Sequence, residues 1–263
     1  AAAHNHKNVC IVVSNLDGAF QLGSEVIARA LQDAQSELRR QEVPITPVDL
    51  DSDEGYAILR KRFIKKMPDD NVIEAIAESY ATALEAAGQA KLIDKGAEQV
   101  AREIRSTYPF HPRTKHLFAL FKDNLEFRQT RGLMELSSLL LKSVWESDED
   151  VYLIGPQHFD LSIRTVSEKL ESISRLGAAI ASDIHEDAGG AVAQVIDNDL
   201  GNRAASQAAA LFLTSSLSTT GDANRGLRER DALAILINPH GGEEDYATAI
   251  DRLYDRASYM HKT

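Results

Sequence analysis

The hydrophobic pattern of the first fifty residues predicts a strand, a helix and a second strand. Residues 9–13 form a continuous apolar run that is mostly β-branched, which is typical of a strand buried on both faces. Apolar residues then recur at helical spacing from Ile27 to Leu38, and a second short strand is predicted at 45–50. Because doubly buried strands have parallel neighbours, we expect a small α/β part that ends at about residue 51.

Beyond residue 52 the pattern predicts one helix after another. The segments have helical apolar spacing and are separated by glycine, proline or small polar residues. The predicted helices cover 53–66, 71–87, 91–104, a segment after Pro112 through Leu117, Leu120 and Phe121, 133–145, 161–180 with a break at Gly177, a short unit at 192–196, 203–216, 227–237 and 244–260. Residues 151–154 are predicted as one further short strand. The fold class is therefore mainly α with a small α/β part.

Two segments interrupt this helical series. Tyr108-Pro109-Phe110-His111-Pro112 must be extended, because proline excludes the α region for the residue before it. The acidic stretch 147–150 is the best candidate for a domain boundary. The sequence therefore predicts three parts, 1–51, 52–147 and 148–263, and the helix, loop, helix order within the last part is similar to that of a winged helix.

Composition narrows the class of protein. The chain has 263 residues, 43% of them hydrophobic, and a net charge of −11, as expected of an acidic globular protein with a sizeable core. The sequence contains no long apolar stretch and no secretory signal pattern, so we expect a cytoplasmic protein. The single cysteine, Cys10, excludes an internal disulfide and a multi-thiolate metal site. The negative charge argues against wholesale coating of nucleic acid, although it leaves room for a local basic patch.

The common nucleotide and hydrolase motifs are absent from this sequence. None of the 15 glycines is followed by lysine, so the chain has no Walker A loop. Gly-x-Gly and Gly-x-Ser-x-Gly are absent as well. We predict no metal site, since His4-Asn5-His6 is too short a motif to indicate one.

Several segments, taken in order, carry a family resemblance. They are Val9 to Asn15, Pro47-Val48 with Glu54, Ile58 to Phe63, Tyr108 to Pro112, Gln129-Thr130-Arg131-Gly132 leading to Trp145, Ala181 to Ile184, Ala208 to Ser216 and Ala247 to Tyr259. Together they resemble prokaryotic AAA+ ATPases that have long been known only as a domain of unknown function and are often encoded beside DNA methyltransferases and helicases in phage-defence clusters. The resemblance implies the last part of a AAA+ α/β core at 1–51, a helical lid at 52–147 and a winged-helix-like tail at 148–263.

The chain departs from the AAA+ pattern at its beginning. Walker A and Walker B motifs, which precede the sensing strand in these ATPases, are missing, and the first methionine is Met67. We therefore expect a chain that begins inside the ATPase core and does not hydrolyse ATP alone. ATP and Mg²⁺ are the implied cofactors, and both should need the upstream segment.

The resemblance also implies roles for single residues. Arg131, with Gly132 beside it and Arg128 as the fallback, corresponds to the sensor-2 arginine that contacts the nucleotide. Asn15 corresponds to sensor 1, and Arg39 or Arg40 to the arginine finger.

Each of these roles has a plainer alternative. Arg131 can pair with Glu126 or Glu135 at a helix start, and Asn15 can be an ordinary turn residue after a strand. Arg39 and Arg40 can simply stabilise a helix C-terminus.

The implied function is ATP-driven remodelling of a DNA-associated, phage-defence complex by a homo-oligomer. The alternative is a non-enzymatic helical module that binds DNA or a partner protein. Two groups of cations are candidates for nucleic-acid contact, namely Arg60, Lys61, Arg62, Lys65 and Lys66, and then Arg225, Arg228 and Arg230. Runs of charge on a helix are more often solvated faces. His111 could approach a nucleotide, but a hydrogen-bonded structural histidine is the simpler interpretation.

Overall fold

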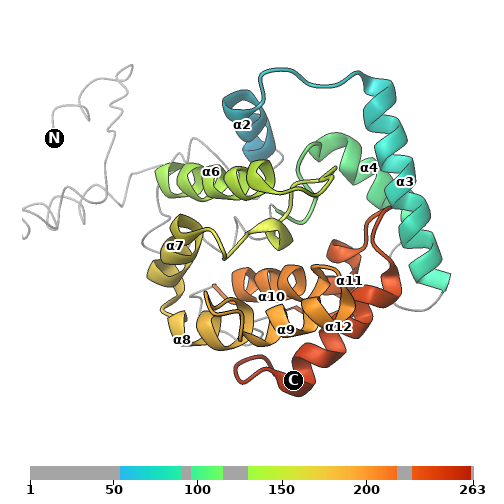
Figure 1. Cartoon of the computed structure of the whole chain (residues 1–263). Coiled ribbons are helices and arrows are strands. Elements are labelled where there is room, and N and C mark those ends of the chain that lie inside the picture. Colours follow the sequence, from blue (N-terminus) through green and yellow to red (C-terminus); the bar gives the residue numbers. More distant parts are fainter. Residues whose placement is uncertain (1–53, 90–95, 115–129, 218–226, 262–263) are drawn as a thin grey trace, which may run out of the picture. The chain divides into compact units, whose positions relative to one another are not determined.

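The computed structural model describes residues 54–89, 96–114, 130–217 and 227–261. Over these ranges the chain forms ten α-helices, one 3-10 helix and one π-helix, without a strand (Figure 1). All of them belong to one compact unit, Val48–Thr263. The prediction of a mainly α fold is confirmed for this part of the chain. The predicted α/β part at 1–51 lies outside the described residues.

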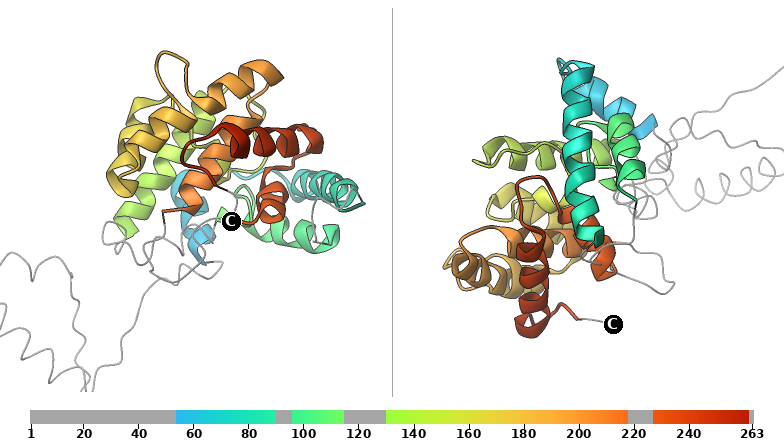
Figure 2. Two further views of the ribbon diagram at one scale, coloured as in Figure 1. Left: turned by 90° about the horizontal axis from the view of Figure 1, so that it is seen from below. Right: turned by 90° about the vertical axis from the view of Figure 1, so that its right-hand side faces the viewer.

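The first helices of the described part are α2 (Glu54–Phe63), α3 (Asp70–Gln89) and α4 (Ala97–Thr107). Helices α3 and α4 lie side by side, and buried alanine, leucine and isoleucine side chains of both belong to the core (Figure 2). Arg105 Nε donates to Glu74 Oε2 across them at 2.6 Å. Because both side chains are partly exposed, this ion pair adds little stability, and apolar burial holds the helices together.

A turn at Pro109 and Pro112, called the proline corner below, follows α4, where the Phe110 N–H donates to Thr107 O at 3.0 Å. The segment 108–112 is therefore extended only in part, at the bridge residue Phe110. The peptide bond between Tyr108 and Pro109 is cis. Ile154 donates its N–H to Pro109 O, and His111 donates its N–H to Ile154 O, each at 2.8 Å. The prediction of a strand at 151–154 is wrong, because only an isolated parallel bridge between Phe110 and Ile154 forms there. Four apolar residues predicted a strand, but the neighbouring chain offers them only this one short extended partner.

The middle of the chain is built from α6 (Thr130–Glu146), η4 (Pro156–His158) and α7 (Arg164–Ser174). Helix α6 packs against both of the others, and Lys169 of α7 lies 3.0 Å from Glu135 of α6. The predicted helix at 161–180 is interrupted, as expected, but at Arg175, which has a φ of 56° and caps α7 in the left-handed conformation. Left-handed helix caps are usually glycine, which is why the sequence pointed to Gly177 instead.

A short α8 (Gly177–Ala179) continues into the π-helix η5 (Ile180–Ile184). The N–H of His185 donates to Ile180 O at 2.9 Å, five residues back. Asp183 is fully buried within this segment, and its carboxylate accepts the N–H groups of Ser258 and Tyr259 at 3.0 and 2.6 Å. The π-helical segment thereby holds the chain that follows the last helix.

The C-terminal helices are α9 (Val192–Leu200), α10 (Ala204–Ser215), α11 (Glu229–Leu236) and α12 (Glu243–Arg256). Most of α10 is buried, including five alanines whose small side chains allow neighbouring elements to approach closely. It packs against η4, α9, α11 and α12 and is the central helix of this half (Figure 1). The helices predicted at 203–216, 227–237 and 244–260 are confirmed, with ends that differ by a few residues.

Packing crosses the predicted boundary at 147, since α6 contacts α7 and η4 on its other side. The division into lid and tail therefore stays a prediction. In the described part of the tail, the β-structure is limited to two isolated bridges, the parallel one from Ile154 to Phe110 and an antiparallel one between Asn238 and Gly241. The resemblance of the tail to a winged helix is likewise still a prediction.

Among the described residues, no helix is long and apolar enough to cross a membrane.

Candidate functional site

The residues that the sequence pointed to are only partly covered by the structure. Asn15, Arg39, Arg40 and Arg128 lie outside the described residues. Arg131 belongs to α6, whose described part begins at Thr130, and Gly132 next to it is buried. The helix expected here is present, and its start and the nucleotide-binding roles of these residues stay predictions.

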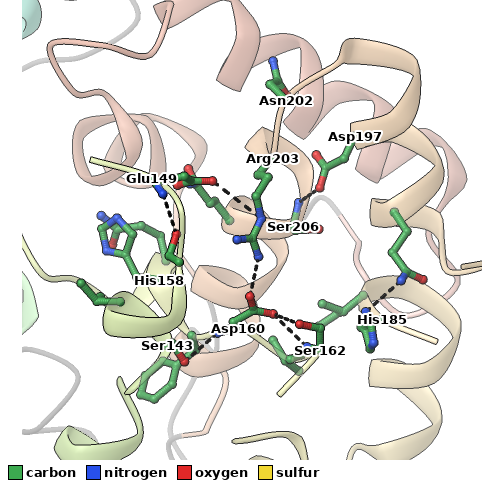
Figure 3. Close-up of a pocket in the computed structure, with 18 of the residues that line it drawn as sticks. Ser143, Glu149, His158, Asp160, Ser162, His185, Asp197, Asn202, Arg203 and Ser206 are labelled. Carbon is green, nitrogen blue, oxygen red and sulfur yellow. Dashed lines mark hydrogen bonds and ion pairs between the residues drawn. The ribbon is translucent and has the colours of Figure 1, made fainter. Parts of the chain in front are cut away.

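A polar cavity of about 530 Å³ lies between the end of α6, the segment that follows it, and helices α9 and α10 (Figure 3). Its polar lining residues include Ser143, Glu149, His158, Asp160, Ser162, His185, Asp197, Asn202, Arg203 and Ser206. Its volume is in the range of small-molecule sites. Residues far apart in sequence meet here because α10 is central to the fold.

Arg203 connects the walls of this cavity. It directly precedes α10, and its Nη2 lies 2.9 Å from Asp160 Oδ2, while its Nε lies 3.7 Å from Glu149 Oε1 (Figure 3). The start of α10 is held in place by Asp197 of α9. The Asp197 carboxylate accepts the N–H groups of Ala205 and Ser206 at 2.7 and 3.0 Å. Helix capping therefore sets the position from which Arg203 reaches both carboxylates.

Asp160 is the best-satisfied carboxylate in the cavity. Its Oδ1 accepts the Ser162 N–H at 2.9 Å and the Ser162 hydroxyl at 2.6 Å, and its own N–H donates to Ser143 Oγ at 3.1 Å. Burial acts to raise the pKa of Asp160, but the bonds from Ser162 and the charge of Arg203 outweigh it, so this pKa lies below its usual value. Asp160 is therefore ionised at neutral pH. Burial raises the pKa of Asp197 on balance, despite its bonds to Ser206 and Ala205.

Two histidines beneath the cavity are neutral at physiological pH. Burial lowers the pKa of His158 to about 4, and its Nδ1 lies 3.1 Å from the N–H of Gly155. Burial, together with the nearby His158, lowers the pKa of His111 to about 3. His111 Nδ1 accepts the Arg113 N–H at 3.1 Å, which confirms the simpler, structural interpretation of this histidine.

A second cavity of about 390 Å³ adjoins the first and shares Glu149, Gln157, His158 and Arg203 with it. The two adjoining cavities are together called the groove. A chain of hydrogen bonds runs along the floor of the second cavity. Gln207 Nε2 donates to Glu149 Oε2 at 2.8 Å, Tyr246 donates its hydroxyl to Gln207 Oε1 at 2.8 Å, and Asn238 Nδ2 donates to the Tyr246 oxygen at 2.9 Å. Burial raises the pKa of Tyr246 to about 12, so its hydroxyl stays protonated. These bonds join the acidic segment to α10 and α12.

Gln157 lies between the two cavities. Its Oε1 is buried and has no hydrogen-bond partner in the structure. A side chain at position 155 would require this amide to shift.

The comparison with protein families now adds to this geometry. Residues 51–216, more than half of the chain, match the family model described as the DUF499 second domain. The chain belongs to the DUF499 family. Comparisons of the chain with curated proteins and with solved structures found no match.

The polar groups of the groove in this DUF499 domain bond mainly to one another. Its serine hydroxyls at 143 and 162 are bonded around Asp160, and its histidines are not paired with a nucleophile among the described residues. Within the same residues, no group of three or more histidine, cysteine, aspartate or glutamate side chains could hold a metal ion. Arg203 is shared by two carboxylates, so the cavity is not arranged to bind an anion strongly.

The sequence did not predict this groove. Glu149 was interpreted only as part of an acidic boundary, and Asp160 and Arg203 were not singled out. The usable signal was local: Asp160-Leu161-Ser162 is the pattern of an aspartate that accepts the N–H two residues later, as it does here. Nothing local in the DUF499 sequence indicates that Arg203 joins Glu149 to Asp160.

Proposed function

We propose that this DUF499 domain is the helical lid and tail of a AAA+ ATPase that binds and hydrolyses ATP to remodel a DNA-associated complex, with a role in phage defence. The sequence resemblance supports this proposal, and so does the helical architecture of the described residues. The family description as a second domain agrees with a module that works beside another one. The missing Walker motifs would be supplied by that other module, which also would hold Mg²⁺.

The segment Thr130-Arg131-Gly132 at the described beginning of α6 carries the proposal. By the sequence resemblance Arg131 lies at the helix end where backbone N–H groups and the helix dipole favour an anion. Gly132 has no side chain to keep a phosphate away. A guanidinium placed at such a helix start has the chemistry to contact the γ-phosphate of ATP and to follow its loss on hydrolysis.

The test is ATP turnover by the natural full-length protein with Arg131→Ala. We expect a loss of about 100-fold, the scale seen when one charge-stabilising donor is removed from an active site. Arg102→Ala is the matched control, because Arg102 is an exposed arginine on α4. Equal turnover in the Arg131 variant and in the control would reject the assignment.

A second candidate is a non-enzymatic helical module that binds DNA or protein. The observation in its favour is the positive charge at 60–66, which has no ion-pair partner within the described part of the chain and which the proposed nucleotide site does not use. Both candidates can hold for one protein, since an ATPase that acts on a DNA-associated complex needs a surface that contacts the complex.

A further inference from the structure

A basic cluster forms at the end of α2 and in the turn that follows it. It consists of Arg60, Lys61, Arg62, Lys65 and Lys66. Four of these side chains are exposed, and Arg60 is half-buried. We propose that this cluster binds the phosphate backbone of duplex nucleic acid without sequence preference. The inference deepens the DNA-associated role proposed above and rests on it.

The cluster is held on a fixed support. Tyr56 and Leu59 of α2 are almost completely buried. The Tyr56 hydroxyl lies within hydrogen-bond distance of His111 O and Pro112 O, at 3.1 and 2.9 Å, and its ring packs on Phe110. Because α2 is anchored at the proline corner, the three cations of its last turn are presented on a fixed helix, and less order has to be gained on binding.

The cations of the cluster differ from most others in the described part of the chain, because none of the five forms an ion pair or side-chain hydrogen bond there. By contrast, Arg105, Arg164, Arg203 and Arg256 each have a carboxylate partner. These five cations therefore form a positively charged patch on a protein whose net charge is −11. Their mutual repulsion is relieved by a polyanion.

The tail arginines are weaker candidates for the same contact. Arg228 Nε lies 2.8 Å from Asp231 Oδ2, so its charge is already compensated. Arg230 also has a partner, and Arg225 lies outside the described residues. The structure thus favours α2 over the tail as the basic surface.

The chemistry around the cluster favours a duplex over the other polyanions. A membrane-surface helix needs exposed apolar anchors, and single strands are held by exposed aromatic rings. The large exposed hydrophobic side chains of the described residues lie elsewhere, at Val72, Trp145, Tyr152 and Tyr259. Phe63, within the cluster, packs against the core instead. The stretch 60–66 extends over at most about 15 Å, which matches roughly four consecutive phosphates of one strand at about 3.4 Å along the axis.

The experiment compares two variants that lose the same charge. The cluster variant carries Lys61→Gln, Arg62→Gln, Lys65→Gln and Lys66→Gln, and the control variant carries Arg102→Gln, Arg164→Gln, Arg228→Gln and Arg256→Gln. Binding of a fluorescent duplex of arbitrary sequence is measured by anisotropy with the full chain at about 50 and 200 mM salt. Circular dichroism establishes that both variants are folded.

We expect the cluster variant to bind at least tenfold more weakly than the unmodified chain at low salt. The slope of log K against log salt should shrink by about 3 to 4, because each lost phosphate contact removes about 0.9. The control variant should keep most of the affinity. Equal losses in both variants would overturn the proposal, since net charge alone would then explain the binding.

Three further results would also overturn it: no duplex binding by the unmodified chain at low salt, tighter binding to a single strand than to the duplex, or binding to anionic lipid vesicles in place of the duplex.

Failure of the duplex-binding proposal is distinguishable from failure of the ATPase proposal. ATP turnover without DNA depends on Arg131 and not on the cluster, so each of the two results can fail while the other stands.

Discussion

Replacement of Asp183 by alanine should detach the C-terminal segment from the helical core. The carboxylate of Asp183 is completely buried in η5 and accepts three hydrogen bonds. Two come from the N–H groups of Ser258 and Tyr259, at 3.0 and 2.6 Å, and the third comes from the Ser182 hydroxyl at 2.8 Å. Asp183→Ala leaves the two backbone donors without their acceptor.

The magnitude follows from the number of bonds and from the exposure of the donors. A hydrogen bond to a charged group contributes about 1.5–3 kcal/mol. Ser258 and Tyr259 are both exposed, so both N–H groups can bond to water once the segment moves away. We therefore expect the lower end for each of the two bonds, a loss of about 3 kcal/mol in the free energy of unfolding. For a unit of this size such a loss lowers Tm by roughly 5–10 °C.

The assay is thermal unfolding followed by circular dichroism, together with hydrogen exchange at the amides of residues 258 and 259. The control is Asp187→Ala, which removes a fully exposed carboxylate close in the sequence. Asp183→Asn keeps one acceptor oxygen and should fall between the two. A change below about 0.5 kcal/mol in Asp183→Ala, with unchanged exchange at both amides, would refute the reasoning.

Two more predictions concern the groove and the histidines below it. The pKa of His111 is lowered from about 6.5 in the unfolded chain to about 3 in the folded one. Between these pH values the unfolded state binds more protons than the folded state, so stability falls as the pH drops below about 6.5. At pH 5 this protonation should lower the free energy of unfolding by about 2 kcal/mol, as measured by urea unfolding. His111→Asn keeps an acceptor near the Arg113 N–H, and its free energy of unfolding should fall by about that much less than that of the unmodified chain. Equal falls in the variant and in the unmodified chain would contradict the assignment. For the ion pair of Arg203 and Asp160, a double-mutant cycle with alanine should give a coupling energy of about 0.5–1 kcal/mol, discounted because the Arg203 side chain is 44% exposed. A coupling indistinguishable from zero would mean that the pair does not brace the groove.

The helices could be predicted from the sequence because their burial is periodic. In α10, alanines recur along a helix that is buried on most sides, and in α12 the buried positions Tyr246, Ala249, Ile250 and Leu253 keep the three- and four-residue spacing. Periodicity does not depend on the partner that covers the face. The predictions that failed depend on such partners: 151–154 became a single bridge because only Phe110 is available, and α7 ends at Arg175 in a left-handed conformation that no local pattern requires.

The groove could not be predicted for the same physical reason. Arg203 meets Glu149 and Asp160 only because α10 packs on η4, and the hydrogen bond from Tyr246 to Gln207 joins two helices that lie far apart in the sequence. The basic cluster was visible in the sequence, since the charge there is contiguous. What the sequence could not tell is that these cations have no carboxylate partner in the described fold.

The central claim is that this DUF499 domain contributes a nucleotide-sensing arginine at the start of α6. The most direct measurement is the ATP turnover of the natural full-length protein in three forms: Arg131→Ala, Arg131→Lys and the control Arg102→Ala. The account predicts a loss of about 100-fold for Arg131→Ala, a smaller loss for Arg131→Lys because a cation remains near the phosphate, and near-normal turnover for Arg102→Ala. Turnover in Arg131→Ala equal to that of Arg102→Ala would contradict the claim.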